Sequence, residues 1–452
     1  MNYLIGIDVG TSATKTVLFD ENGQIKGSVS CEYPLYQPEN GWAEQKAEDW
    51  RDAGLKTLKE VMELSGVPAE EVKGIGISGQ MHGLVMLDEQ GEVLRPSIIW
   101  CDQRTGEEVE DMLRIMPRER WIQITANPPL IGWTAAKILW VRKHEPEIYA
   151  RCRHILLPKD YIRYILTGVF ATEVSDASGM QLLDVPGRCW SDEVLEKLEI
   201  PKEWLGTVYE SCQVTGTLLP EIAEQTGLST EVKVVGGAGD NAAAAVGTGV
   251  VRDGSAFTTI GTSGVVFAHS SKVTIDPKGR VHTCCCAVPG AWHVMGVTQG
   301  AGLSLKWFKD QFCQDYVAEA KKQGVDVYDL INRDIEKIPV GSDRLLYLPY
   351  LMGERSPHND PDARAMFIGM SMDTTRADMT QAVLEGVAFG LRDSLEVARS
   401  LGIQIDRTKI CGGGVKSPLW RKIIANVMNL KVDVIESEEG PGYGAAILAA
   451  VG

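Results

Sequence analysis

Short apolar runs alternate along this chain with longer segments whose apolar positions lie three or four residues apart. The first run, residues 3–7, is followed by a Gly-Thr-Ser turn at 10–12 and by a second run, residues 16–19. Two such runs joined by a glycine turn predict a β-hairpin. Residues 255–270 repeat the pattern around a second Gly-Thr-Ser turn at 261–263. We therefore expect one hairpin at the start of each half of the chain.

Helical periodicity dominates the segments between and after the hairpins. Amphipathic helices are predicted at 47–64, 132–149, 303–312 and 376–401, a strand-turn-strand at 72–88, and a strand, glycine turn and helix at 408–428. Strands that alternate with helices in two similar halves predict an α/β fold made of two duplicated domains, each with a mixed sheet. We place the domains at 1–247 and 248–452.

Composition narrows the class of protein. The 452 residues are 44% hydrophobic and 23% charged, as in an ordinary globular protein of more than one domain. The net charge of −16 disfavours a nucleic acid or an anionic membrane as partner, because such partners need a basic face. Asp8 interrupts the N-terminal apolar run, so no signal peptide is expected, and we predict a cytoplasmic protein.

Ten cysteines are spread through the chain without the CxxC spacing of a zinc site. The run at 284–286 cannot hold one metal ion, because neighbouring side chains of a strand point to opposite faces. We expect reduced, structural thiols.

The two Gly-Thr-Ser turns are candidate phosphate sites. Glycine lets backbone N–H groups approach an anion, and hydroxyl and lysine side chains add donors. The candidate residues are Gly10, Thr11, Ser12 and Lys15 in the first turn and Gly261, Thr262 and Ser263 in the second. The first turn is not a Walker A loop, because residues 10–15 lack its second glycine. Asp8, close to the first turn, suits Mg²⁺, which prefers one or two carboxylates together with phosphate oxygens and water.

Two further glycine-rich stretches remain ambiguous from the sequence. Gly412, Gly413 and Gly414 follow a strand and precede a helix, where the backbone can approach a flat base or an anion, although a simple tight turn has the same pattern. The stretch 440–450 is either a second wall of a ligand pocket or a helix packed closely on its neighbour. We favour close packing there.

Polar and aromatic residues at strand ends are candidates for a sugar site. Met81 and His82 lie between glycines after a strand, and Trp100 begins the sequence WCDQR, whose aromatic, carboxylate and guanidinium groups are typical of polyol pockets. A single histidine is more often a structural residue, so the sequence alone leaves its role open.

The stretch GGAGDNAAAA, residues 236–245, has the glycine spacing of a dinucleotide fingerprint. Asp240, however, stands where the pyrophosphate would lie, and no acidic ribose partner follows about 20 residues later. We reject the dehydrogenase hypothesis. A carboxylate at a helix start among small residues instead suits a general base, and we expect the helix dipole to keep it ionised at neutral pH.

Taken in order, these motifs resemble the FGGY carbohydrate kinases, and within them the xylulokinases. The resemblance rests on GIDVGTSATK, GISGQMHG, WCDQRT, GWTAAKILWVRKH, LLPKDYIRYILTG, GGAGDNAAAAVG, IGTSG, LPYLMGERSPHNDPDARAMFIGM, AVLEGVAFGLRD and CGGGVKSPLWRKIIANV. It implies two actin-like, ribonuclease H-like domains with sugar and ATP in a cleft between them. It also implies ATP-dependent and Mg²⁺-dependent phosphorylation of a sugar, expected to be D-xylulose, at a terminal hydroxyl.

The same resemblance assigns roles to residues. It implies Asp240 as the catalytic base, Asp8 as the metal-side acid, and Met81, His82 and Asn241 as sugar contacts, with Gly412, Gly413 and Gly414 on the adenosine side. Other pentuloses, hexuloses or polyols stay open as substrates, as does a non-catalytic regulator, although two retained aspartates disfavour the latter. Homodimers are common in this family, and the sequence leaves the oligomeric state open. Because the chain ends at Gly452, the ATP-side domain is expected to be short.

Overall fold

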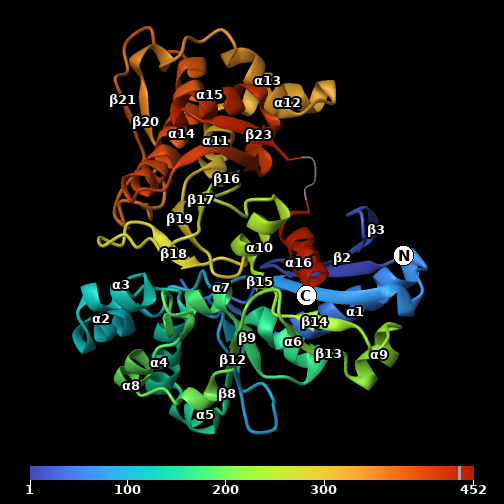
Figure 1. Ribbon diagram of the computed structural model, residues 1–452. Helices are drawn as coiled ribbons and strands as arrows, with labels where there is room; N and C mark the ends of the chain where they lie inside the picture. The colour runs from blue at the N-terminus through green and yellow to red at the C-terminus, as the bar shows by residue number, and fades with distance from the viewer. Residues whose placement is uncertain (436–438) are drawn as a thin grey trace. The chain divides into compact units, whose positions relative to one another are not determined.

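The computed structural model describes residues 1–435 and 439–452, which form two compact units (Figure 1). The first unit contains Met1–Val251, Thr283–Trp292 and Glu439–Gly452, and the second contains Arg252–His282 and the described part of 293–438. The expected domains, 1–247 and 248–452, treated each half as one continuous segment. The contacts group two later segments, 283–292 and 439–452, with the first unit. The domain bounds of 1–247 and 248–452 stay a prediction.

The first unit is built on a mixed sheet with the order β13-β14-β5-β1-β2-β3, and β15 also pairs with β5. Its strands are β1 (Tyr3–Val9), β2 (Ala13–Asp20), β3 (Ile25–Glu32), β5 (Val72–Gly79), β13 (Val214–Thr217), β14 (Lys233–Val235) and β15 (Ala238–Gly239). Strands β1 and β2 are antiparallel, as the first predicted hairpin requires, whereas β1, β5 and β15 run parallel. Ile5, Ile7 and Val9 of β1 are fully buried.

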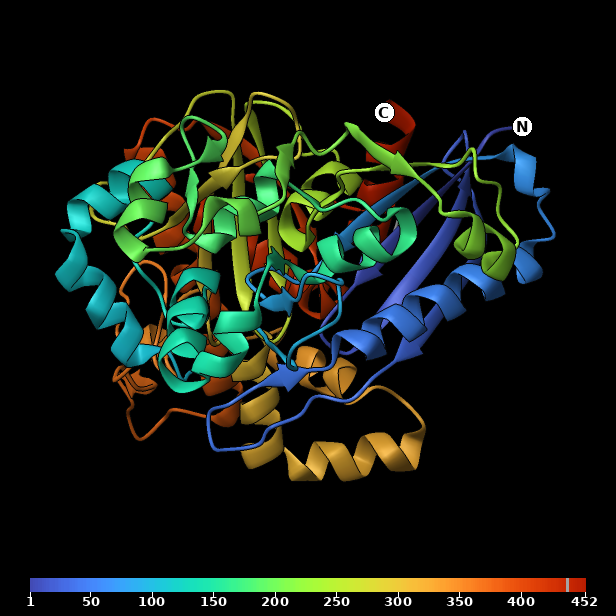
Figure 2. The ribbon, with the colours of Figure 1, turned by 90° about the horizontal axis from the view of Figure 1, so that it is seen from below.

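Helices and short strands complete the first unit. The helices are α1 (Ala47–Ser65), α2 (Gly106–Ile115), α3 (Arg118–Thr125), α4 (Thr134–His144), α5 (Pro146–Arg151), α6 (Pro158–Thr167), α7 (Val174–Ala177), α8 (Asp192–Leu198), α9 (Pro220–Thr226), α10 (Asp240–Gly247) and α16 (Gly440–Val451). The short strands are β4 (Glu44–Gln45), β6 (Val85–Leu87), β7 (Ser97–Ile98), β8 (His154–Leu156), β9 (Ala171–Glu173), β10 (Leu183–Asp184), β11 (Cys189–Trp190) and β12 (Thr207–Tyr209). Strand β18 (His282–Cys285) has its first residue in the second unit and the others in the first. Figure 2 shows α1, the longest of these helices, running beside the blue strands of the sheet. The predicted helix at 132–149 is divided in two, because Pro146 cannot donate the hydrogen bond that would continue α4.

Helix α16 packs directly on the first unit's sheet and on α10, with backbone against backbone. A Cβ atom at Gly76 would lie 1.9 Å from the carbonyl oxygen of Ala445, and one at Gly444 would lie 1.8 Å from that of Ala243. Only glycine allows these approaches. The close-packing interpretation of residues 440–450 is therefore confirmed, and it explains why the chain's last segment belongs to the first unit.

The second unit repeats the plan of the first. Its sheet includes the order β19-β17-β16-β22-β23, with β16 and β17 antiparallel and β22 parallel to β16. Its strands and helices are β16 (Gly254–Ile260), β17 (Gly264–Ser270), β19 (Trp292–Thr298), β20 (Leu346–Leu348), β21 (Met366–Ile368), β22 (Ile405–Cys411), β23 (Lys431–Val434), α11 (Gly302–Phe312), α12 (Gln314–Gln323), α13 (Val327–Ile335), α14 (Arg376–Ser400) and α15 (Pro418–Met428). The second predicted hairpin and the predicted helices at 303–312 and 376–401 are thus observed, and the duplicated α/β fold is confirmed.

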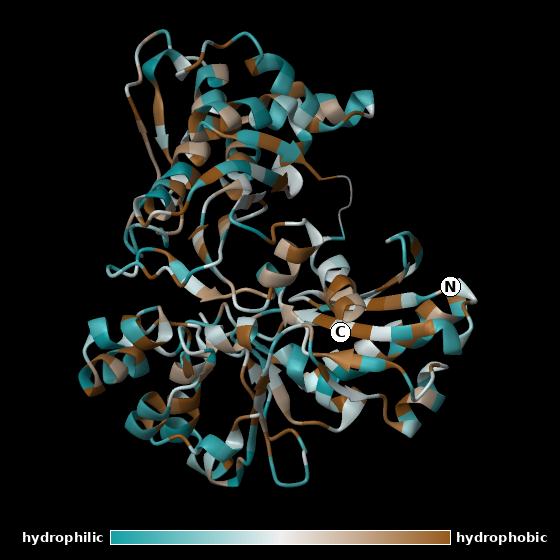
Figure 3. Cartoon of the chain, viewed as in Figure 1, coloured by the Kyte–Doolittle hydropathy of each residue, from teal (hydrophilic) through white to brown (hydrophobic). Residues whose placement is uncertain are grey.

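Each unit has its own apolar core. Figure 3 shows hydrophobic residues along the sheet strands and on α16, while most surface helices are mixed or hydrophilic. Within residues 1–435 and 439–452, no helix combines the length and hydropathy needed to cross a bilayer. All ten cysteines lie in the described part of the chain, and none forms a disulfide bond.

Candidate functional site

The predicted residues of the first unit gather at the carboxyl ends of three parallel strands. Asp8 of β1 pairs in register with Ser78 of β5, and Ser78 pairs with Ala238 of β15. The residues that follow these positions, 10–12, 80–82 and 240–241, therefore leave the sheet at the same edge. In open α/β sheets, ligands bind outside the carboxyl ends of the strands.

Asp240 is the first residue of α10, directly after β15. Its Oδ1 accepts hydrogen bonds from the backbone N–H of Asn241 at 2.6 Å and from the Asn241 side-chain amide at 2.9 Å. Burial, followed by repulsion from Asp8, nevertheless raises the pKa of Asp240 to about 7. The expectation of full ionisation at neutral pH is therefore wrong, because desolvation outweighs the hydrogen bonds at the helix start.

Asp8 is the second carboxylate of this edge. Its Oδ1 atom is buried and has no hydrogen-bond partner among the described residues. Burial raises the pKa of Asp8 to about 6, with Ser78 and Lys15 opposing the rise and Glu439 adding to it. A buried carboxylate oxygen without a partner is suited to a cation, and Asp8 belongs to no cluster of three metal-ligand side chains among the described residues. A divalent ion there would need phosphate oxygens and water to complete its coordination.

Met81 and His82 lie in the turn after β5, beside the segment that carries Asp240. The Met81 side chain fills the space that the missing side chain of Gly239 leaves, because a Cβ there would lie 2.9 Å from Met81 Cγ. His82 has φ 68°, a strained conformation for a residue with a bulky side chain. Its ring stacks on Trp133 at 4.5 Å, and Nδ1 lies 2.7 Å from the carbonyl oxygen of Gly179.

The strained backbone of His82 is held by α4. The His82 carbonyl oxygen accepts hydrogen bonds from Thr134 Oγ1 at 3.1 Å and from Lys137 Nζ at 2.6 Å. Lys137 is fully buried, and burial lowers its pKa to about 7. Strain that the surroundings maintain in this way is typical of a functional site.

The first Gly-Thr-Ser turn is fixed through its carbonyl groups. Gly10 O accepts from the Tyr33 hydroxyl and Gln80, Thr11 O accepts from Gln45, and Ser12 O accepts from the Tyr33 backbone. The backbone N–H groups of Thr11 and Ser12 donate to no group among the described residues. With the carbonyl groups engaged, these donors are available to an anion.

Two side chains near this turn are already engaged by neighbours. Lys15 Nζ forms an ion pair with Glu439 at 2.6 Å, so its ammonium group is balanced by a carboxylate from the chain itself. Trp100 is 39% exposed, and its indole N–H donates to Thr11 Oγ1 at 2.9 Å. Trp100, a predicted sugar contact, thus lies against the turn that is the first predicted phosphate site.

The other polar residues of WCDQR are structural. Asp102 is fully buried and accepts hydrogen bonds from the backbone of Ala43 and from Arg104. The Arg104 guanidinium also pairs with Glu44 at 2.8 Å and lies 3.8 Å from the ring centre of Trp42. The carboxylate and guanidinium that suggested a polyol pocket are used within the core.

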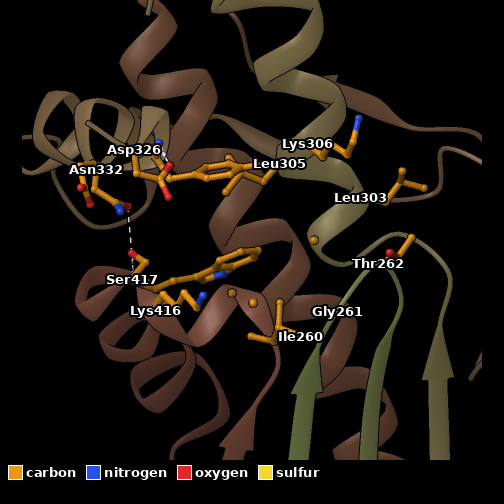
Figure 4. Close-up of a pocket in the computed structure, with 16 residues that line it drawn as sticks. Ile260, Gly261, Thr262, Leu303, Leu305, Lys306, Asp326, Asn332, Lys416 and Ser417 are labelled. Atoms are coloured by element: carbon orange, nitrogen blue, oxygen red, sulfur yellow. Dashed lines mark hydrogen bonds between the residues drawn. The ribbon is translucent and has the colours of Figure 1, made fainter. Parts of the chain in front are cut away.

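A pocket of about 430 Å³ in the second unit brings the second Gly-Thr-Ser turn together with the glycine turn after β22 (Figure 4). Its lining residues are Ile260, Gly261, Thr262, Gly302, Leu303, Leu305, Lys306, Asp326, Tyr328, Asp329, Asn332, Gly413, Gly414, Lys416, Ser417 and Trp420. Ser263 and Gly412 do not line it. A Cβ at Gly412 would lie 2.6 Å from the carbonyl oxygen of Ile260, and φ is 90°, so this glycine serves the backbone turn.

Residues of α13 complete the pocket and had no signal in the sequence. Asn332 Oδ1 accepts a hydrogen bond from Ser417 Oγ at 2.8 Å, which joins α13 to the start of α15. Figure 4 shows this pair on one side of the pocket and Gly261 and Thr262 on the other. The apolar walls, with a few polar groups placed among them, and the volume are typical of small-molecule sites.

Comparison with known proteins identifies the family. Residues 3–247 match the N-terminal domain of the FGGY family of carbohydrate kinases, and residues 256–452 match its C-terminal domain. The chain is 40% identical to a xylulose kinase from Bacillus subtilis over all of this chain and 88% of that protein.

Two solved structures of kinases are similar to this chain along its whole length. The structure of a xylulose kinase from Rhodospirillum rubrum has a TM-score of 0.93 at 28% identity, and one titled as a xyloylose kinase from Brucella ovis has 0.91 at 36%. Each similarity covers all of this chain and 90% of the solved one. The chain therefore belongs to the FGGY family of carbohydrate kinases, enzymes that phosphorylate sugars.

Proposed function

We propose that this enzyme transfers the γ-phosphoryl group of ATP to the terminal hydroxyl of D-xylulose and forms D-xylulose 5-phosphate. The substrate is supported by the 40% identical xylulose kinase from Bacillus subtilis, which this chain matches along its whole length. The observation that carries the chemistry is Asp240, a half-buried carboxylate whose pKa is about 7, beside Asp8 at the carboxyl edge of the first unit's sheet.

Asp240 is the proposed general base. A carboxylate with a pKa near 7 exists in both protonation states at neutral pH, which suits a group that must accept a proton and release it again in each turnover. As the sugar oxygen attacks the γ-phosphorus, the proton of its hydroxyl passes to a carboxylate oxygen of Asp240. The bond between the γ-phosphorus and the β,γ-bridging oxygen breaks, and ADP leaves. General base catalysis of this kind contributes about 10²- to 10⁴-fold to a rate.

Met81, His82 and Asn241 are the proposed sugar contacts. Met81 offers an apolar surface, and the stacked and hydrogen-bonded ring of His82 offers a fixed polar edge. Asn241 already orients Asp240 through two hydrogen bonds, so a contact between its amide and the sugar would align base and acceptor together. Fixed groups of this kind hold the hydroxyl in a position to react.

The second unit's pocket is the proposed nucleotide site. Leu305, Tyr328 and Trp420 supply apolar surface for a purine, and the Asn332–Ser417 pair supplies polar groups for the sugar or base. The turns at 261–263 and 10–12 are proposed to contact the phosphates through their N–H groups and hydroxyls.

Asp8 is the residue proposed to hold Mg²⁺, because its buried Oδ1 lacks a partner among the described residues. When bound, the ion would neutralise charge on the phosphates, where most of the catalysis of phosphoryl transfer arises.

A substrate panel tests the proposal. The purified enzyme is supplied with MgATP and with D-xylulose, D-ribulose, L-ribulose, D-fructose, D-gluconate or glycerol, and ADP release is followed. We expect the highest kcat/KM with D-xylulose and a product phosphorylated at the C5 oxygen by ³¹P NMR. A higher kcat/KM with any other member of the panel would assign the enzyme a different substrate. The absence of sugar-dependent ADP release throughout would refute the kinase activity itself.

A further inference from the structure

A group of buried charged side chains lies next to residues 236–239, the segment that leads to Asp240. Lys159 of α6 has its Nζ 2.7 Å from Asp160, 3.3 Å from Glu173 and 3.4 Å from Asp176. All four side chains are fully buried. Arg163 adds a second cation, 3.0 Å from Asp160. Burying charges costs several kcal/mol each, and apolar residues often stabilise a fold equally well, so such a group suggests a task beyond stability.

Glu173, at the end of β9, is the best-connected member of the group. Its carboxylate accepts hydrogen bonds from the backbone N–H and the hydroxyl of Ser175, from the backbone N–H of Asp176 and from the Ser211 hydroxyl, at 2.7–2.8 Å. Together with Lys159, these four donors leave the carboxylate one orientation. Glu173 therefore fixes Ser175 at the start of α7.

Ser175 connects this group to the Asp240 segment. Its hydroxyl donates to Glu173 and accepts a hydrogen bond from the backbone N–H of Gly239 at 3.1 Å. Gly239 is the N-cap of α10, the residue immediately before Asp240. Two more bonds hold the same segment, from Arg163 to the Gly236 carbonyl at 2.9 Å and from the Gly237 N–H to the Ser211 carbonyl at 2.9 Å.

We propose that Ser175 and Glu173 are positioning residues for Asp240. Glu173 orients the Ser175 hydroxyl, and this hydroxyl fixes Gly239 and with it the place where α10 begins and the Asp240 carboxylate points. This inference rests on the proposed role of Asp240 as general base.

Charged side chains near Asp240 influence the pKa values of this part of the structure. Asp8 of β1 raises the pKa of Asp240, and Asp240 in turn raises the pKa of Asp176 of α7. Burial raises the pKa of Asp176 well above its ordinary value, and Lys159 opposes this. Burial lowers the pKa of Lys159, but the three carboxylates around it raise it further, so the lysine stays charged.

Loss of the Ser175 hydroxyl would release Gly239 and expose more of the half-buried Asp240 to water. Because burial is the main cause of the raised Asp240 pKa, better hydration moves that pKa down. The acid limb of the rate profile would move to lower pH, while kcat would fall because the base is no longer held against the sugar hydroxyl.

The test compares Ser175→Ala with Ser178→Ala. Ser178 is also fully buried at the end of α7, and its hydroxyl also makes two hydrogen bonds, to the Val174 carbonyl at 2.7 Å and from the Cys285 N–H at 3.0 Å. The two variants thus lose the same group from similar surroundings, but only Ser175 contacts Gly239. Glu173→Gln, which keeps the shape and removes the charge, is a second variant.

We expect Ser175→Ala to lower kcat with D-xylulose by about 10- to 100-fold, with the KM for ATP unchanged and the acid limb shifted to lower pH. Glu173→Gln should change kcat in the same direction, and Ser178→Ala should keep the wild-type kcat and profile. Amide hydrogen exchange of residues 236–241 should become faster in Ser175→Ala and Glu173→Gln only.

A wild-type rate and pH profile in Ser175→Ala, or an equal loss of rate in Ser178→Ala, would overturn the proposal. Unchanged exchange at 236–241 would also overturn it, and this measurement needs no turnover. If the wild-type enzyme phosphorylates no sugar, the proposed function fails, whereas the exchange result still decides whether Ser175 holds Gly239.

Discussion

At the residue scale, burial and a second carboxylate, Asp8, determine the protonation of Asp240. Burial and repulsion by Asp8 raise the pKa of Asp240 to about 7, whereas the sequence led us to expect a carboxylate ionised throughout the neutral range. The positions of both residues could be predicted from motifs. Their pKa values could not, because desolvation depends on which side chains from distant parts of the chain surround each carboxylate.

A pH profile tests this interaction. Because the base must be unprotonated, kcat/KM for D-xylulose should fall as the pH drops below about 7. Asp8→Asn removes the negative neighbour, lowers the Asp240 pKa and should move this acid limb to lower pH, with a lower plateau. Asp52→Asn, which removes an exposed carboxylate of α1, should leave the limb in place. A limb that stays at the same pH in Asp8→Asn would contradict the coupling.

The raised pKa of Asp240 predicts that its ionised form destabilises the folded chain. Its pKa rises from 3.8 to about 7 on folding, so between these pH values the folded chain binds a proton that the unfolded chain has lost. The contribution of Asp240 to the free energy of unfolding therefore becomes less favourable as the pH rises from 3.8 to about 7. Above pH 7 the destabilisation is complete. Asp240→Asn should raise Tm more at pH 8 than at pH 5, measured by calorimetry against Asp52→Asn. An equal gain at both pH values would show that Asp240 is not desolvated.

At the element scale, the hairpins and long helices follow from sequence patterns, but the placement of α16 does not. Glycines at 6 and 76 interrupt otherwise ordinary apolar strands, and nothing in their sequence says that a helix more than 350 residues later contacts the bare backbone there. Asp326, the N-cap of α13, and Asn332 within it were missed for a similar reason. This short amphipathic helix carries no motif, and only the fold brings these residues to the pocket.

Helix α16 offers a matched pair of substitutions. Gly444→Ala would place a Cβ 1.8 Å from the Ala243 carbonyl oxygen, whereas Gly442→Ala meets nothing within 4 Å. Overpacking of this kind costs about 1–3 kcal/mol, and alanine in an open helical position stabilises by up to about 1 kcal/mol relative to glycine. Denaturant unfolding should show Gly444→Ala destabilised and Gly442→Ala equal to or above wild type. Equal stability of the two variants would contradict the close packing.

Gly413 offers a test of the nucleotide pocket. A Cβ at this lining position meets nothing within 4 Å, so a larger side chain can enter the pocket without disturbing the fold. Gly413→Leu should raise the KM for ATP by about 10-fold or more, because the leucine occupies volume that the nucleotide needs. The KM for the sugar and the Tm are the internal controls. An unchanged KM for ATP would exclude this pocket as the nucleotide site.

At the scale of the whole molecule, one α/β plan occurs twice and carries different chemistry in each copy. The first hairpin has Asp8 before its glycine turn, and the second has Thr259 at the matching position. This asymmetry was visible in the sequence and is consistent with one unit supplying the proposed metal and base groups and the other the proposed nucleotide pocket. The sequence could not show that Ser263 and Gly412 lie outside the pocket, because the lining depends on how the two turns fold.

The most direct test of the central claim is the sugar-dependent rate of Asp240→Asn beside wild type and Asp52→Asn, with saturating MgATP and D-xylulose. Asparagine keeps the size of the side chain but cannot accept the proton. We predict that kcat falls by about 10²- to 10⁴-fold in Asp240→Asn, with ATP affinity and fold intact, while Asp52→Asn keeps the wild-type rate. A full sugar-dependent rate in Asp240→Asn would show that another group accepts the proton.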